Sequence, residues 1–461
     1  MRRESSIRMT AVHHAQLMEH LFPGDGREAV AIATCGRSQG PERDTLIVQQ
    51  IQPIPYSVCD RAADFITWPT ECIMPLLDRA AQRQLQLVKI HSHPGGFAEF
   101  SSQDDRSDRA LFPFIANWTG EQISNASAVV LPSGSMFGRA VSSKGDFAPL
   151  SCIAVTGDDL CFWYRESFGA VPEFARRHAQ LFGSGTTAKM GRLRIGIVGC
   201  SGTGSIVALQ LAHLGVAYLV LIDPDRVEEK NLNRIPGATM KDACEHAFKV
   251  DVAKRYVEAL SLGTRVSAMA SDLATPSAVR AIADCDIVFG CMDGAEGRHL
   301  LNRISAFYLL PYFDLGVRLD ADGCGGVEQV CGTVHYLQPG RSSLLSRGVF
   351  TLEDVRAEGL KRTDPAAYRD QLRSKYIVGV QEDRPAVISV NMQVASIAVN
   401  EMLARLHPFR EDPNSEYAAS RLSIRHGQMF SERDGAPCGL LSRHAGRGDV
   451  TPLLDRPDLS E

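Results

Sequence analysis

One stretch, residues 193–223, decides the fold of the second half of the chain and reads LRIGIVGCSGTGSIVALQLAHLGVAYLVLID. Its apolar runs predict two strands joined by a helix. The turn before the helix carries Gly199, Gly202 and Gly204, and glycine allows backbone amides to approach a phosphate at a helix N-terminus. Asp223 follows Gly199 by 24 residues and is placed to accept hydrogen bonds from a ribose. The stretch therefore predicts a nucleotide site without specifying the nucleotide.

Polar residues after this stretch distinguish between nucleotides. Asn231 and Arg234 lie three apart, Lys249 begins a predicted helix, and Asp293 follows a predicted strand at residues 286–290. Hydride transfer needs no such cluster. Attack of a carboxylate on the α-phosphorus of ATP does, because the pyrophosphate charge must be neutralised.

We therefore predict that Arg234 and Lys249 bind phosphates, that Asn231 orients the ATP chain and that Asp293 holds Mg²⁺ at the ligand side of the sheet. The structural alternative is that both cations are solvated surface charges and that Asp293 caps a helix starting at Ala295.

In this order the residues resemble the ubiquitin-activating superfamily, which includes bacterial activators of sulfur-carrier proteins. The resemblance covers about residues 172–406. It implies that Asp223 is the ribose acid, that Asn231 and Arg234 are the N-x-x-R pair, and that the substrate is a ubiquitin-like protein ending in glycine. It also implies that Arg176 reaches the γ-phosphate in a neighbouring subunit, and hence a homodimer.

The chain departs from this superfamily in two places. Ser201 stands at the second glycine of the usual G-x-G-G-x-G run, and no C-x-x-C pair is present for a structural zinc. No cysteine lies between Gly332 and Pro437, where thioester-forming members keep a nucleophile. The remaining candidates are Cys324, Cys331 and Cys438. We select Cys438, because its polar, glycine-containing surroundings make burial least expected there.

A second chemical motif precedes the nucleotide stretch and reads HSHPGGFAEFSSQDD, residues 91–105. His91 and His93 sit two apart at the end of a predicted strand, so both side chains project to the same side. With Asp104 they supply three protein ligands, the number that a catalytic zinc uses while its fourth position stays open. Glu28 is our candidate general base, and Ser101 could donate a hydrogen bond to an oxyanion. The alternative is a turn followed by a capped helix.

The spacing H-x-H-x7-S-x-x-D with an upstream glutamate resembles the JAMM (JAB-type) metalloprotease family, which cleaves after the C-terminal glycine of ubiquitin and ubiquitin-like proteins. The resemblance covers about residues 10–145. It implies zinc ligation by His91, His93 and Asp104, an oxyanion role for Ser101 and a base at Glu28. Because the motif is complete, we expect an active site.

Composition and length set the organisation. The 461 residues are 44% apolar and 22% charged, with a net charge of −5, no basic block and 12 cysteines without a C-x-x-C pair. We therefore expect a cytoplasmic globular enzyme that binds neither nucleic acid nor membrane. We predict an α/β chain with a JAMM-type α/β zinc-protease domain at 1–145 and a linker at 146–171. A Rossmann-like, mostly parallel, doubly wound sheet domain follows at 172–461, with an irregular tail from about 410.

The two halves predict one function. The first would release or expose the C-terminal glycine of a ubiquitin-like protein with Zn²⁺, and the second would adenylate it with ATP and Mg²⁺. A conjugating enzyme is a further candidate partner in a bacterial conjugation setting. One alternative is a sulfur-carrier adenylyltransferase with a maturing protease. Another is a first domain that only docks a tail without cutting it, and a dehydrogenase is the least favoured.

Overall fold

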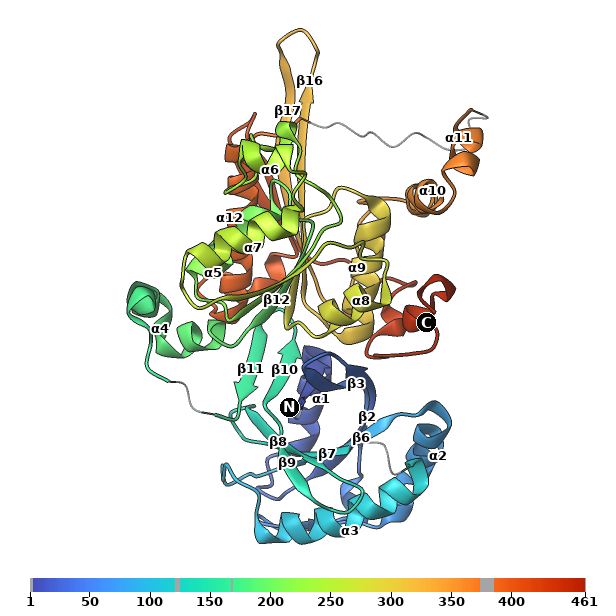
Figure 1. Cartoon of the computed structure of the whole chain (residues 1–461). Helices are drawn as coiled ribbons and strands as arrows, with labels where there is room; N and C mark the ends of the chain where they lie inside the picture. The colour runs from blue at the N-terminus through green and yellow to red at the C-terminus, as the bar shows by residue number, and fades with distance from the viewer. Residues whose placement is uncertain (1–2, 121–124, 167–168, 374–384, 461) are drawn as a thin grey trace. The chain divides into compact units, whose positions relative to one another are not determined.

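The computed structural model describes residues 3–120, 125–166, 169–373 and 385–460, which form two compact units (Figure 1). The first unit comprises Met1–Ser167, Phe307–Leu309 and Ala445–Asp455. The second comprises Phe168–Ala306, Leu310–His444 and Arg456–Glu461. Among the described helices, none is both long enough and apolar enough to cross a membrane.

The first unit is built on a nine-stranded mixed sheet with the order β11-β10-β1-β3-β2-β6-β7-β8-β9. Its strands are β1 (Glu4–Thr10), β2 (Val30–Gln39), β3 (Arg43–Pro53), β6 (Gln86–Ser92), β7 (Asn125–Val130), β8 (Met136–Val141), β9 (Phe147–Pro149), β10 (Cys152–Thr156) and β11 (Leu160–Tyr164). Its helices are α1 (Ala11–Leu21), α2 (Met74–Arg83) and α3 (Ser102–Thr119), and a separate small sheet pairs β4 (Asp60–Arg61) with β5 (Ile66–Thr67).

Both faces of this sheet are covered, and β2 shows how the sequence achieves it. Ala31 and Ala33 belong to the core that includes Leu17 of α1, whereas Val30 and Ile32 belong to the core that α2 and α3 fill. Successive side chains of a strand point to opposite faces, so one apolar run serves two cores. As a result β6, which pairs with β2 and β7, is buried along its length.

The second unit contains an eight-stranded sheet with the order β14-β13-β12-β15-β16-β17-β18-β19. Its strands are β12 (Arg194–Val198), β13 (Tyr218–Ile222), β14 (Arg265–Met269), β15 (Ile287–Gly290), β16 (Tyr312–Ala321), β17 (Val327–Leu337), β18 (Ala419–Ser423) and β19 (Gln428–Glu432). The first five strands in this order pair in parallel, and the remaining pairs are antiparallel. β16 and β17 extend beyond their neighbours as a two-stranded ribbon (Figure 1).

The described part of the second unit contains nine helices, and some of them cover the sheet. They are α4 (Arg176–Met190), α5 (Gly204–His213), α6 (Met240–Cys244), α7 (Lys249–Ala259), α8 (Pro276–Ala283), α9 (Ala295–Tyr308), α10 (Leu352–Thr363), α11 (Pro365–Arg373) and α12 (Ile388–Leu406). α5, α7 and α12 lie on one face, whereas α8 and α9 lie on the other (Figure 1). The strand order reverses between β12 and β15, which places a ligand crevice at their carboxyl ends. The predicted α/β organisation with a Rossmann-like, parallel-rich sheet is confirmed.

Two segments differ from their sequence-based description. Residues 146–171, described as a linker, contain β9, β10 and β11 of the first sheet. The stretch from about 410, described as an irregular tail, contains β18 and β19 of the second sheet. All these strands are short. β10 pairs with the distant β1 and β18 with the distant β17, whereas β9 forms a hairpin with β8. Pairing with a distant strand supplies the order that local pattern does not.

The end of α12 is fixed by a buried cation. Arg405 is 0% exposed, and its Nη2 lies 2.7 Å from Glu401 Oε1 and 2.7 Å from the Tyr417 carbonyl oxygen, to which it donates. Its guanidinium carbon lies 3.6 Å from the centre of the Tyr336 ring on β17. The pair therefore ties α12 to the antiparallel part of the sheet.

We predict that Arg405→Ala lowers the free energy of unfolding by about 3–5 kcal/mol, because it removes a fully buried side chain, its hydrogen bond to the Tyr417 carbonyl oxygen and one of the two ion pairs of Glu401, whose other partner is Arg410. Denaturant titration followed by circular dichroism measures the change. The matched control is Lys254→Ala, which removes an ion pair with Glu258 between two largely solvated side chains and is expected to cost less than about 1 kcal/mol. Equal losses in the two variants would contradict the prediction.

Candidate metal centre and nucleotide site

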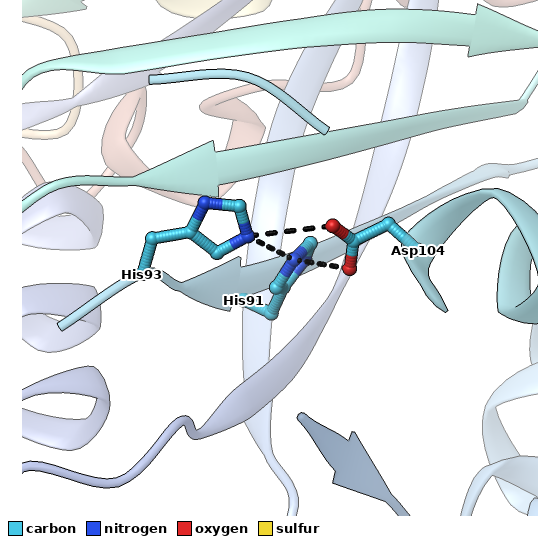
Figure 2. A group of neighbouring side chains, drawn as sticks. All are labelled: His91, His93 and Asp104. Carbon is cyan, nitrogen blue, oxygen red and sulfur yellow. Dashed lines mark hydrogen bonds and ion pairs between the residues drawn. The ribbon is translucent and has the colours of Figure 1, made fainter. Parts of the chain in front are cut away.

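Three side chains predicted as metal ligands converge in the first unit (Figure 2). His91 lies near the end of β6, His93 follows that strand, and Asp104 lies in the first turn of α3. His91 Nε2 is 2.9 Å from Asp104 Oδ1, His93 Nε2 is 3.4 Å from Asp104 Oδ2, and the two Nε2 atoms are 3.2 Å apart. All three residues are buried.

The start of α3 orients the carboxylate of Asp104. Ser101 caps this helix in a capping box: its Oγ accepts from the Asp104 amide at 3.1 Å, and its amide donates to Asp104 Oδ2 at 2.7 Å. Ser101 Oγ also donates to Asp104 Oδ2 at 2.7 Å. The S-x-x-D spacing is thus a helix cap as well as part of the cluster. The oxyanion role of Ser101 stays a prediction, since its hydroxyl here faces Asp104.

The ring of His93 is held from the other side. Its Nδ1 lies 2.8 Å from the Phe97 carbonyl oxygen, so the proton belongs on Nδ1 and the lone pair of Nε2 faces Asp104 and His91. Burial opposes protonation of His93, but hydrogen bonds to Asp104 and Phe97 and the charges of Asp104 and Glu28 together raise its pKa. His91 is more deeply enclosed, and burial lowers its pKa.

These ligand atoms fit a zinc ion. Bonds of about 2.0–2.1 Å in a tetrahedron place neighbouring ligand atoms about 3.3 Å apart. The three observed separations between ligand atoms, 2.9, 3.2 and 3.4 Å, lie within 0.4 Å of that value. Two imidazoles and one carboxylate also leave one tetrahedral position for water, as in catalytic zinc sites.

Glu28 lies beside this cluster, two residues before β2. Its Oε1 is 4.0 Å from His93 Nε2, and the residue is 5% exposed. Burial, with a contribution from Asp104, raises the pKa of Glu28 to about 7 against the opposing effect of His93. Burial also acts to raise the pKa of Asp104, but its hydrogen bonds with His91 and His93 outweigh burial and hold that pKa well below its usual range. A carboxylate with a pKa near neutrality suits a general base.

We predict that the purified chain holds about one zinc ion, and that Asp104→Asn and His93→Gln lose most of it, because each removes one of three protein ligands. Inductively coupled plasma mass spectrometry after dialysis measures the metal content. Glu28→Gln is the matched control: it changes a neighbouring carboxylate outside the ligand set and should retain zinc. Metal content near zero in the unaltered chain, or unchanged content in both ligand variants, contradicts the assignment.

Seven of the eight predicted nucleotide residues line one cavity in the second unit, and Gly204 is not among the lining residues. The cavity has a volume of about 510 Å³. It lies at the carboxyl ends of β12 and β15, where the strand order of the sheet reverses. Its lining includes Gly199, Gly202, Asp223, Asn231, Arg234, Lys249 and Asp293. The seven come from five separate segments of the chain, so their convergence is a property of the fold.

The glycine turn requires glycine for steric reasons. Gly199 has φ +90°, and a Cβ there would lie 2.6 Å from the Cys291 carbonyl oxygen. A Cβ on Gly204 would lie 1.8 Å from the Gly199 carbonyl oxygen, which no relaxation of a side chain could relieve. Ser201, the departure from the usual glycine run, also lines the cavity.

The acid at the end of β13 and the lysine of α7 are both held in place. Asp223 accepts the Cys200 amide at 2.6 Å and the Asp225 amide at 2.8 Å, and burial raises its pKa against the opposing charge of Lys249. Lys249 Nζ donates to Asp225 Oδ2 at 2.7 Å. Since Asp225 is largely exposed, the ammonium could exchange this partner for a phosphate.

Asn231 ends the 3₁₀ segment Glu229–Asn231, and Arg234 lies in the turn that follows it, so the two residues do not share a face of an α-helix. Asn231 Oδ1 accepts the Glu228 amide at 2.9 Å. Arg234 Nη1 donates to the Lys230 carbonyl oxygen at 2.8 Å. Asp293 precedes α9, and it contributes to the lining.

Two predicted catalytic residues do not join these sites. Arg176 lies at the start of α4, its side chain is 68% exposed, and it pairs with Glu173 at 2.9 Å. Cys438 is 3% exposed, so the expectation of an accessible thiol there is wrong. The Cys438 amide donates to the carbonyl oxygen of Arg341, 97 residues earlier in the chain. Burial acts to raise the pKa of the thiol, but a hydrogen bond with Ser343 and backbone hydrogen bonds outweigh it and lower that pKa.

Sequence reasoning missed further cavity residues. Asn391 of α12 and Glu358 of α10 line the nucleotide cavity. Glu358 Oε2 accepts the amide of Glu296 at 2.8 Å, at the first turn of α9. Both residues lie in ordinary helical sequence, and nothing in the local pattern connects them to a glycine turn more than 150 residues earlier.

A parallel-rich sheet with a nucleotide cavity at its reversal, together with a domain that carries a histidine–carboxylate triad, defines an E1-like chain with a JAB-like first domain. The chain belongs to the ThiF family, whose model matches residues 175–434. A second family model, described as prokaryotic homologs of the JAB domain, matches residues 10–139. The two resemblances inferred from the sequence are therefore confirmed.

Individual relatives match part of the chain. Ubiquitin-like modifier-activating enzyme 5 of Drosophila erecta is 28% identical over 169 residues, which cover 32% of this chain and 37% of that protein. Adenylyltransferase and sulfurtransferase uba4 of Aspergillus clavatus is 35% identical over 114 residues, which cover 25% of this chain and 23% of that protein. The chain thus spans well under half the length of these curated relatives.

Among solved structures, E. coli MccB with MccA-N7isoASN is similar to this chain with a TM-score of 0.46 and 18% identity. The similarity covers 59% of this chain and 75% of that chain.

Proposed function

We propose that the second unit adenylates the C-terminal glycine of a ubiquitin-like protein with ATP and Mg²⁺, and that the first unit is a zinc isopeptidase for proteins of the same kind. The single observation that carries the adenylation proposal is the cavity of about 510 Å³ in which the glycine turn, Asp223, Asn231, Arg234, Lys249 and Asp293 meet. Dehydrogenation would leave the cations and Asp293 without a role.

In the proposed reaction a carboxylate oxygen of the terminal glycine attacks the α-phosphorus of ATP. The bond from that phosphorus to the bridging oxygen breaks, and pyrophosphate leaves. Lys249 and Arg234 neutralise the polyphosphate charge, and Asp223 holds the ribose hydroxyls. Asp293 would hold Mg²⁺ together with phosphate oxygens, which is the usual ligand set of this ion, and the ion would stabilise the leaving pyrophosphate.

A neighbouring cavity supports a path for the substrate tail. It has a volume of about 570 Å³, lies against β16, β17 and β18, and shares Asp293 and Pro385 with the nucleotide cavity. Its polar lining includes Thr333 and Arg318. We propose that the tail lies there, because this cavity adjoins the nucleotide cavity at Asp293 and would let the terminal carboxylate approach the α-phosphorus.

For the first unit, His91, His93 and Asp104 would hold zinc, which supplies Lewis acidity when bound. Glu28 accepts a proton from the attacking water and delivers it to the leaving amine. Rotation of the Ser101 hydroxyl away from Asp104 would let it donate to the developing oxyanion. The rival in which this unit only docks a tail requires no proton transfer by Glu28.

Two further parts of the proposal concern partners. Arg176 projects from α4 with an exposed side chain, as a residue that acts in a neighbouring subunit would, and a homodimer would supply it in trans. The buried sulfur of Cys438 favours transfer of the acyl group from the adenylate, with release of AMP, to an external sulfur or conjugating enzyme over a thioester on this cysteine. A non-reducing gel of the reaction with ATP and a ubiquitin-like protein, with Cys438→Ala alongside, tests for that thioester.

We predict that ATP–pyrophosphate exchange, stimulated by a small protein ending in glycine, falls at least about 100-fold in Asp293→Asn, because charge stabilisation of the leaving group is lost. A radiolabel exchange assay with a panel of ubiquitin-like and sulfur-carrier proteins measures it. Asp251→Asn, on the exposed side of α7, is the charge-matched control and should retain full exchange. Absence of exchange with every panel member overturns the adenylation proposal.

We predict that Glu28→Gln lowers hydrolysis of a peptide extension behind the C-terminal glycine about 10²- to 10⁴-fold, since the amide cannot accept a proton. Cleavage is followed by mass spectrometry on zinc-loaded protein. Glu71→Gln, on the exposed turn before α2, serves as the matched control and keeps full cleavage. Unchanged cleavage in Glu28→Gln, or none in the unaltered chain, would favour the docking alternative.

A further inference from the structure

Asn391 is a buried amide in the first turn of α12 that lines the nucleotide cavity. It is 4% exposed. Among the described parts of the chain, no residue forms a hydrogen bond with its side chain, whose polar atoms are open to the cavity. Its backbone amide is satisfied by the Val387 carbonyl oxygen, so only the side chain lacks a partner there.

The other buried asparagines behave differently. The side-chain oxygens of Asn125, Asn231 and Asn302 each accept a backbone amide, and Asn414 Nδ2 donates to the Ala404 carbonyl oxygen. Each of these four therefore holds a strand, a loop or a helix end in place. The side chain of Asn391 is the exception: its amide faces the cavity and is available to a ligand.

The position of Asn391 identifies that ligand chemically. A Cβ placed on Gly202 would lie 2.2 Å from Asn391 Nδ2 and 3.1 Å from Arg234 Cδ. The amide group thus lies directly over the second glycine of the phosphate turn, next to an arginine. Anions approach such a turn because its backbone amides and the N-terminus of α5 face them.

We propose that Asn391 binds the polyphosphate of the nucleotide, with Nδ2 donating a hydrogen bond to a non-bridging phosphate oxygen. This inference rests on the proposed adenylation function and adds a binding residue from the last helix of the unit. A neutral donor adds no charge to a site that already holds Lys249 and Arg234. It fixes the direction of the polyphosphate, because a planar amide donates only along its N–H bonds.

The experiment compares Asn391→Ala and Asn391→Asp with the unaltered full chain, using isothermal calorimetry with ATP and with adenosine. Asn391→Ala should weaken ATP binding about 10- to 100-fold, the size expected for one lost hydrogen bond to a charged group. Asn391→Asp should weaken it further, because a carboxylate repels phosphate. Adenosine, which carries no phosphate, should bind all three proteins equally, and the melting temperature without nucleotide should stay within about 2 °C.

A neighbouring control is Met392→Ala, which alters a half-exposed side chain of the same helical turn outside the cavity lining and should leave ATP binding unchanged. ATP affinities within twofold in both Asn391 variants overturn the inference while leaving adenylation intact. A parallel loss of ATP binding, adenosine binding and melting temperature assigns Asn391 a structural role and also overturns it. If the unaltered chain binds no ATP, the proposed function itself fails.

Discussion

The arrangement of the second unit depends on the contact between Gly199 and Gly204, the two ends of its glycine turn. The α-carbon of Gly204 lies so near the Gly199 carbonyl oxygen that no side chain fits between them. This packing starts α5 immediately after β12 and directs the helix N-terminus at the reversal of strand order. The residues from β13, α7, β15 and α12 then meet around that point because the parallel strands all end at the same edge.

The sequence predicted the elements whose signals are local. The strand–turn–helix unit around Gly199 and the triad of His91, His93 and Asp104 each depend on residues within about 30 positions, so spacing alone was sufficient. Lys249 and Asp293 were predictable because strand ends of a doubly wound sheet converge. The same reasoning accounts for the confirmed fold class.

Other features depended on contacts between distant segments, and sequence reasoning missed them. β18 pairs with β17 and β19 pairs with β18, and this pairing with the sheet is not visible in the local sequence pattern. Cys438 lies in a polar sequence, yet it is buried, and its amide donates to the carbonyl oxygen of the distant Arg341. Asn391 is one of many polar residues on a long helix, and only the packing of α12 against α5 brings it to Gly202.

The carboxylate of Glu358 accepts a hydrogen bond from the Glu296 amide, at the N-terminus of α9 that follows Asp293. The N-terminus of α9 carries partial positive charge, which stabilises negatively charged groups such as the Glu358 carboxylate. Glu358 thus supplies from α10 the negative charge that stabilises this helix end, and a substitution that removes its carboxylate would leave the Glu296 amide without this side-chain partner.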